Sequence, residues 1–200
     1  MPIPIDQLVS EINPEQTVLL FGSGSSIPSG APSTMQICDY LAQHFGFESS
    51  DLNLPELSAI IERRRNRVDL IKAVRELFVG IEPTGGLLTI PRFKWKSIYT
   101  TNYDDLLEQA FRRFDEPLAV YASNFDFDAD KLPNSLRLMK LHGSIKEDVS
   151  DGSKTRLIIT ENDYSLTEEY REYLYDSLKR DLAGADLIII GHSLADPYIR

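Results

Sequence analysis

Cysteine is nearly absent from this 200-residue chain, in which Cys38 stands alone. A single cysteine excludes an internal disulfide and any zinc site built from several cysteines, and it fits a reducing compartment. Long hydrophobic runs are absent as well, since no apolar stretch approaches the length that crosses a bilayer. The start of the chain carries no pattern of a secretory signal peptide. We therefore expect a cytoplasmic protein that binds no metal and no membrane.

Basic residues are outnumbered, with 21 Lys and Arg against 31 Asp and Glu, for a formal net charge of −10. A field of that sign attracts neither nucleic acid nor anionic lipid, so we expect neither as a direct partner. The one basic run, residues 63–67, is typical of a solvated helix face. With a hydrophobic content of 42%, two hundred residues suit one globular domain with a substantial core.

The stretch from Thr17 to Pro32 organises the rest of the chain. Thr17–Phe21 is an uncharged apolar run, which predicts a strand buried on both faces. Gly22 and Gly24 follow in a serine-rich loop, where glycine permits a sharp turn and lets a ligand approach bare N–H groups. A strand, a Gly-Ser turn and a following helix are typical of a phosphate-binding cradle. A tight turn that binds no ligand is the alternative interpretation.

Strands and helices alternate along most of the remaining chain, which predicts a Rossmann-like, three-layer α/β fold with a mostly parallel sheet of about six strands. Residues 33–90 carry helical periodicity only, and within them residues 54–79 form one broken helix or two. We interpret 33–90 as a mainly helical insertion beside the sheet. A long helix is expected from Glu161 to about Ala183. The five further strands are expected at 97–101, 118–121, 136–141, 156–160 and 186–190.

Polar and glycine clusters follow four of these strands, at residues 22–26, 102–104, 142–144 and 191–196. The carboxyl ends of parallel strands meet at one edge of a sheet, where ligands of such folds bind. Taken singly, each cluster has a purely structural alternative: Asn102 as a turn residue, Asp104 as a helix cap, His142 as a hydrogen-bonded histidine at a strand end. Taken together, they predict a shared pocket.

Four ordered motifs carry a resemblance to sirtuin-like domains, and more narrowly to the sirtuin-like NAD hydrolases of bacterial antiphage defence. This resemblance extends over nearly the whole chain from about residue 17 onward, although residues 33–90 contribute nothing to it. The motifs are GSGSSIPSGAP at 22–32, TNYD at 101–104, KLHGS at 140–144 and GHSLADP at 191–197.

The resemblance implies NAD as the substrate and assigns a role to each matching residue. It implies that His142 is the catalytic histidine and that Asn102 and Asp104 lie beside the nicotinamide ribose and carboxamide. The diphosphate contacts that it implies are Gly22, Ser23, Gly24 and Ser26. The contacts that it implies on the adenosine side are Gly191, Ser193 and Asp196.

Two departures disfavour protein deacetylation. Deacetylating sirtuins hold a small domain together with a four-cysteine zinc site, which a chain with one cysteine cannot build. The Asp-Phe-Arg that follows the first motif in deacetylases is Ser33-Thr34-Met35 here. The expected activity is therefore hydrolysis of NAD to nicotinamide and ADP-ribose. The alternatives are a non-catalytic domain that senses NAD or ADP-ribose, and a deacylase or ADP-ribosyltransferase.

Unrestrained NAD hydrolysis would be toxic, so control by an oligomer, a further domain or a partner is expected. The chain stops soon after its last polar loop, and we expect the natural protein to continue beyond residue 200. The resemblance implies a homo-oligomer and, as candidate partners, an Argonaute-type protein, a HerA-type helicase or a phage protein.

Overall fold

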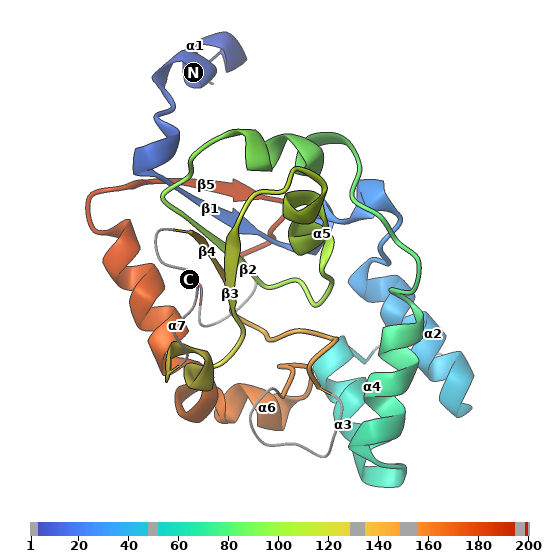
Figure 1. Ribbon diagram of the computed structural model, residues 1–200. Coiled ribbons are helices and arrows are strands. Elements are labelled where there is room, and N and C mark those ends of the chain that lie inside the picture. Colours follow the sequence, from blue (N-terminus) through green and yellow to red (C-terminus); the bar gives the residue numbers. More distant parts are fainter. Residues whose placement is uncertain (1–3, 48–51, 129–134, 149–155, 195–198, 200) are drawn as a thin grey trace.

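A computed structural model describes residues 4–47, 52–128, 135–148, 156–194 and 199. Its centre is one sheet of five strands in the order β3-β4-β2-β1-β5 (Figure 1). Every pair of neighbouring strands is parallel. The predicted α/β class and parallel sheet are confirmed. The strands are β1 (Thr17–Phe21), β2 (Ser97–Thr100), β3 (Leu118–Tyr121), β4 (Leu136–Lys140) and β5 (Asp186–Ile190).

The prediction of six strands is wrong, because residues 156–160 form no strand. The apolar side chains of this run are buried as expected. Its backbone, however, bonds to carboxylates in place of a neighbouring strand. The N–H of Leu157 donates to Asp148 Oδ2 at 2.9 Å, and that of Ile159 donates to Asp163 Oδ2 at 3.2 Å. Burial alone therefore misled the prediction, since a strand also needs a partner strand for its N–H groups.

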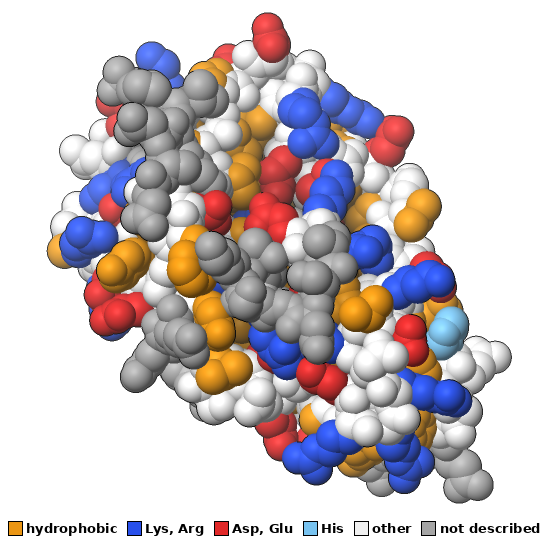
Figure 2. Space-filling view, turned by 60° about the horizontal axis from the view of Figure 1, so that its bottom comes forward, with side chains coloured by type: hydrophobic (Ala, Val, Ile, Leu, Met, Phe, Trp, Pro, Cys, Tyr) orange, Lys and Arg blue, Asp and Glu red, His pale blue; other side chains and the backbone are white. Residues whose placement is uncertain are grey.

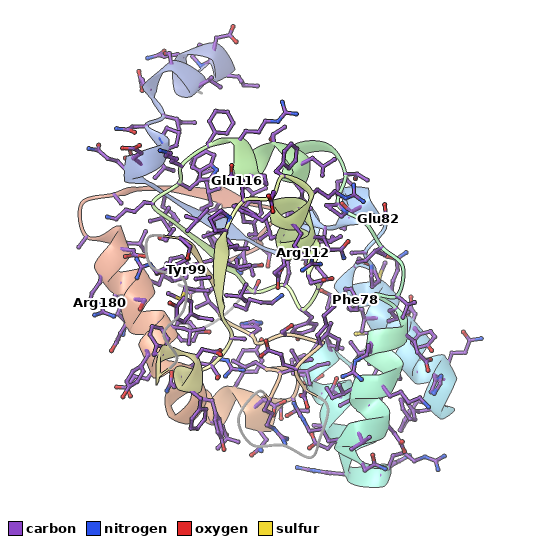
Figure 3. All side chains as sticks on the ribbon, in the orientation of Figure 1. Phe78, Glu82, Tyr99, Arg112, Glu116 and Arg180 are labelled. Atoms are coloured by element: carbon purple, nitrogen blue, oxygen red, sulfur yellow. The ribbon has the colours of Figure 1, made fainter. Side chains whose placement is uncertain are left out.

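Helices cover both faces of the sheet, with α5 and the 3₁₀ helix η4 on one face and α7 on the other (Figure 1). Figure 3 shows Tyr99 of β2 in the interior on the α7 side, where its hydroxyl donates to Asp181 Oδ2 at 2.8 Å. The α-helices are α1 (Ile5–Glu11), α2 (Thr34–Phe45), α3 (Leu54–Arg64), α4 (Arg67–Glu76), α5 (Leu106–Arg113), α6 (Glu161–Ser165) and α7 (Thr167–Leu182). The 3₁₀ helices are η1 (Pro14–Gln16), η2 (Ser23–Ser25), η3 (Ile27–Ser29), η4 (Gly85–Arg92) and η5 (Asn124–Asp128).

All of the elements described between β1 and β2 are helical, as the periodicity predicts. Residues 54–79 contain two helices, because α3 ends at Arg64 and the side chain of Asn66 accepts from the N–H of Asp69 at 2.8 Å to start α4. Helices α2, α3 and α4 pack on one another beside the sheet, with a core of their own (Figure 1). The expected long helix after Glu161 is likewise two, α6 and α7, which divide at Leu166.

The basic run at residues 63–67 is only partly exposed to solvent. Arg63, Arg64 and Arg65 are exposed, as predicted, but Arg67 is only 2% exposed. Its guanidinium bonds to Asp148 at 2.6 Å and to Asp163 at 3.2 Å, which makes it an internal counter-ion. On the face that Figure 2 displays, acidic and basic side chains intermingle.

Candidate active site

A pocket of about 1010 Å³ opens at the carboxyl edge of the sheet. Register fixes this edge, because Phe21 of β1 pairs with Thr100 of β2 and Ile190 of β5, and Thr100 pairs with Lys140 of β4. The four strands thus end level with one another, and the loop after each contributes to the lining. The predicted convergence of four polar clusters on one pocket is what the structure has.

Most of the sequence-predicted site residues line this pocket. Gly22 lies behind the lining, buried against the loop after β5. Asp196 falls outside the described residues. The residues that line the pocket are Ser23, Gly24, Ser26, Asn102, Asp104, His142, Gly191 and Ser193.

Asn102, which follows β2, is 6% exposed, and only the nitrogen of its side-chain amide is hydrogen-bonded. Its Nδ2 donates to Ser26 Oγ at 2.9 Å and to Ser25 Oγ at 3.2 Å, which ties the loop after β2 to the glycine loop. Its Oδ1 is buried and has no hydrogen-bond partner in the part of the chain that the structure describes. A buried acceptor without a donor is costly, so this oxygen is suited to accept a hydrogen bond from a bound ligand.

Asp104 is 7% exposed at the floor of the pocket. Its Oδ2 accepts from Ser26 Oγ at 2.8 Å, and its Oδ1 accepts from the N–H of Leu106 at 3.1 Å. Burial raises the pKa of this carboxyl, although nearby Lys140 and the two hydrogen bonds work in the opposite direction. The bond to Leu106, the first residue of α5, also makes Asp104 a local support for this helix, although the N-cap position itself is Asp105.

His142 lies at the end of β4 and is 7% exposed. Its ring meets that of Tyr164 edge to face, with the centroids 5.8 Å apart and the planes at 83°. The glycine that follows it, Gly143, leaves no space for a ligand. A Cβ on Gly143 would lie 2.8 Å from Arg171 Nη2, and φ there is +81°. Gly143 thus allows a turn and a buried guanidinium behind the histidine.

The glycines of the first motif serve the packing of two loops. The N–H of Gly22 donates to Ile190 O and that of Gly24 to Gly191 O, both at 2.9 Å. A Cβ on Gly22 would lie 2.7 Å from Gly191 O, and one on Gly24 would lie 2.9 Å from it. Both N–H groups are therefore occupied within the protein, whereas the sequence had suggested that a ligand takes them.

The helical segment supplies a wall that the motifs did not reveal. The start of α2 contributes Ser33 and Thr34, and the start of α3 contributes Asn53. Phe78 follows α4 and faces the pocket from the same side (Figure 3). The segment after 156 adds Tyr164 to the lining. Ser33 and Asn53 each begin a capping box, which marks the start of a helix and not a ligand site.

The lining has no Lys or Arg side chain among the described residues. Its acidic side chains are Asp104 and Glu161, and its imidazoles are His142 and His192. An anionic group would therefore rely on hydroxyls and on the N-terminus of α2, a 12-residue helix that begins at the pocket. Within the described ranges, no cluster of three His, Cys, Asp or Glu side chains could hold a metal ion, and none of the helices is both long and apolar enough to cross a membrane.

Comparison with known proteins places these features in a wider group. A family model described as a SIR2-like domain matches residues 96–200. The chain is 24% identical over 202 residues to the NAD(+) hydrolase ThsA of Acinetobacter baumannii (strain 532279), and 21% identical over 199 residues to that of Bacillus cereus (strain MSX-D12). Each alignment covers 98% of this chain and 40% of the relative, so the chain spans well under half of these relatives.

The fold has a counterpart among solved structures. A chain described as "Structural Basis for the Mechanism and Regulation of Sir2 Enzymes" superposes with a TM-score of 0.54 at 18% identity, covering 91% of this chain and 72% of that one. At that identity the likeness concerns the fold alone.

Proposed function

This chain belongs to the SIR2-like family, and from that premise we propose that it is an NAD glycohydrolase, which cleaves NAD to nicotinamide and ADP-ribose. The two relatives named as NAD(+) hydrolases support the choice of substrate and reaction. The observation that carries the proposal is the unpartnered, buried Oδ1 of Asn102, which lies in one pocket with His142 and Asp104.

The reaction breaks the bond between ribose C1′ and the nicotinamide nitrogen. The electron pair of this bond stays with nicotinamide, which leaves as a neutral molecule, and the ribose passes through an oxocarbenium-like state. A water oxygen then bonds to C1′, and His142 accepts the proton that this water loses. Asn102 Oδ1 orients the water or a ribose hydroxyl by accepting a hydrogen bond from it. Asp104 holds the nicotinamide end.

The rest of NAD follows the lining away from His142. Ser23 and the start of α2 are suited to the diphosphate, because a hydroxyl and a helix N-terminus favour a phosphate group where no basic side chain does. Ser26 donates its one hydroxyl proton to Asp104, so in this proposal it supports Asp104 and Asn102. In this proposal Gly22 and Gly24 act by holding their loop against the loop after β5. Gly191, Ser193 and Asp196 then form the adenosine side.

The biological role proposed is that of a regulated, NAD-depleting effector in antiphage defence, as the family resemblance implies. The domain proposed is a sirtuin-like unit over residues 1–200, in which 33–90 is a helical insertion. Control by a homo-oligomer, a further domain or a trigger protein is part of the same proposal.

The test is incubation of the protein with NAD, with and without an acylated peptide, followed by measurement of free nicotinamide. We expect nicotinamide and ADP-ribose in equal amounts, released without the peptide. Release only with the peptide would indicate a deacylase. NAD binding without release, in a protein activated by its full chain or partner, would instead indicate a sensing module and would refute the hydrolase.

A further inference from the structure

Tyr164 stands out as an unassigned residue in the pocket. It lines the cavity together with His142, and the two rings make an edge-to-face contact with centroids 5.8 Å apart. Aromatic rings favour this geometry, because the positive edge of one ring meets the negative face of the other. The contact joins residues 22 positions apart in the sequence, and none of the four motifs includes Tyr164.

Helix α6, which carries Tyr164, is anchored more firmly than a five-residue helix would be alone. Its first turn is a capping box, in which Thr160 Oγ1 accepts from the N–H of Asp163 at 3.2 Å and the Asp163 carboxylate accepts from the N–H of Thr160 at 2.8 Å. Asp163 also binds the buried Arg67 of α4 at 3.2 Å and Arg156 through its Nε. Although burial alone would raise the pKa of Asp163, these two arginines hold it below its ordinary value.

The turn that carries His142 is fixed to the same segment. The N–H of Ile158 donates to His142 O at 3.1 Å, and Tyr103 Oη donates to Ile158 O at 2.7 Å. Arg171 Nη2 fills the space beside Gly143 and donates to Arg156 O at 2.6 Å. The backbones of the two segments are therefore fixed relative to each other, and the ring of Tyr164 packs against the imidazole of His142 from this fixed position.

We propose that Tyr164 is a positioning residue, whose ring holds the imidazole of His142 in the orientation that proton transfer requires. The catalytic consequence rests on the proposed hydrolase function, whereas the orientation does not. Proton transfer needs the accepting nitrogen within hydrogen-bond reach of the water, and a misplacement of about 1 Å can lower a rate by about 100-fold. The aromatic ring is sufficient for this role, so phenylalanine at position 164 should serve as well as tyrosine.

The first test compares Tyr164→Leu and Tyr164→Phe with the wild type in the activated protein. We expect Tyr164→Leu to lower kcat by about 10- to 100-fold with KM for NAD changed by less than about threefold. Tyr164→Phe keeps the ring and should stay within about threefold of wild-type kcat. The matched control is Tyr173→Leu, since Tyr173 makes a similar edge contact with Phe127 and is absent from the pocket lining. It should leave kcat unchanged.

The second test observes the imidazole directly and needs no activity. The chain has three histidines, His44, His142 and His192, so their ring signals can be separated by NMR of histidine-labelled protein. A neighbouring aromatic ring displaces such signals, so those of His142 should move in Tyr164→Leu and stay near their wild-type position in Tyr164→Phe. His44 provides the internal reference.

The outcomes separate the two proposals. A wild type that releases no nicotinamide would refute the hydrolase, and the NMR comparison would still decide whether the ring of Tyr164 packs against the imidazole of His142 in solution. Unmoved His142 signals in Tyr164→Leu would overturn the positioning role. So would wild-type kcat in Tyr164→Leu, a loss of kcat matched by loss of folding, or a Tyr164→Phe variant as impaired as Tyr164→Leu.

Discussion

Replacing Gly191 by alanine should distinguish two reasons for a glycine in this protein, a left-handed backbone conformation and a close contact between two loops. Gly191 has φ +65° and Gly30 has φ +87°, so both lie in the left-handed region that disfavours a side chain. A Cβ on Gly30 would have no atom within 4 Å, whereas one on Gly191 would lie 2.2 Å from Ser25 N and 2.6 Å from Gly24 C. Gly30→Ala is therefore a matched control that carries the backbone cost alone.

The structure allows a rough magnitude for each change. The left-handed conformation costs an L-residue about 1–2 kcal/mol, which is the whole expected loss for Gly30→Ala. In Gly191→Ala, the loops after β1 and β5 must also separate, which adds overpacking of about 1–3 kcal/mol. The 2.9 Å bond from Gly24 N–H to Gly191 O is then lost, at about 1 kcal/mol. We expect about 3–6 kcal/mol in all for Gly191→Ala.

The assay is thermal unfolding of both variants, alongside nicotinamide release. For a chain of this size 1 kcal/mol corresponds to about 2–4 °C in Tm, so Gly191→Ala should lose about 10 °C and Gly30→Ala about 3 °C. Displacement of the glycine loop also moves the serines that hold Asn102, so the activity of Gly191→Ala should fall by about 100-fold. Equal losses of Tm in the two variants would refute the packing argument.

Four further substitutions test the site and its surroundings. His142→Ala and Asn102→Ala should each lower nicotinamide release by about 10²–10⁴-fold while Tm and NAD affinity stay near wild type, and full activity in His142→Ala would remove the catalytic assignment. Burial raises the pKa of Asp104, so the ionised carboxylate lowers the stability of the folded protein at neutral pH. Asp104→Asn should therefore lower activity but raise Tm at about pH 7. This gain in Tm should disappear as the pH falls toward about 4. Burial would raise the pKa of Asp163, but two arginines outweigh it, so the pKa is lowered. The carboxylate therefore stabilises the fold at neutral pH, and this stabilisation is lost as the pH falls below about 4. Asp163→Asn should lower Tm at neutral pH and make Tm depend less on pH in the acid range.

The sequence by itself determined the elements whose signal is local. The uncharged run of β1 predicted a strand buried on both faces, and all five of its residues are buried. The helical period of residues 33–90 likewise holds in the structure. Because parallel strands expose their carboxyl ends on one edge, the polar residues after β1, β2, β4 and β5 could be assigned to one pocket without coordinates.

Only the tertiary structure decided how residues distant in sequence share space and hydrogen bonds. The run at 156–160 has the composition of a strand, but the carboxylates of Asp148 and Asp163 accept from the N–H groups of Leu157, Ile159 and Thr160. Arg67 belongs to a basic run, yet it is buried as the partner of those same carboxylates. The contact of Tyr164 with His142 arises in the same way, from a segment that buried ion pairs hold in place, and no periodicity along the chain encodes such a meeting.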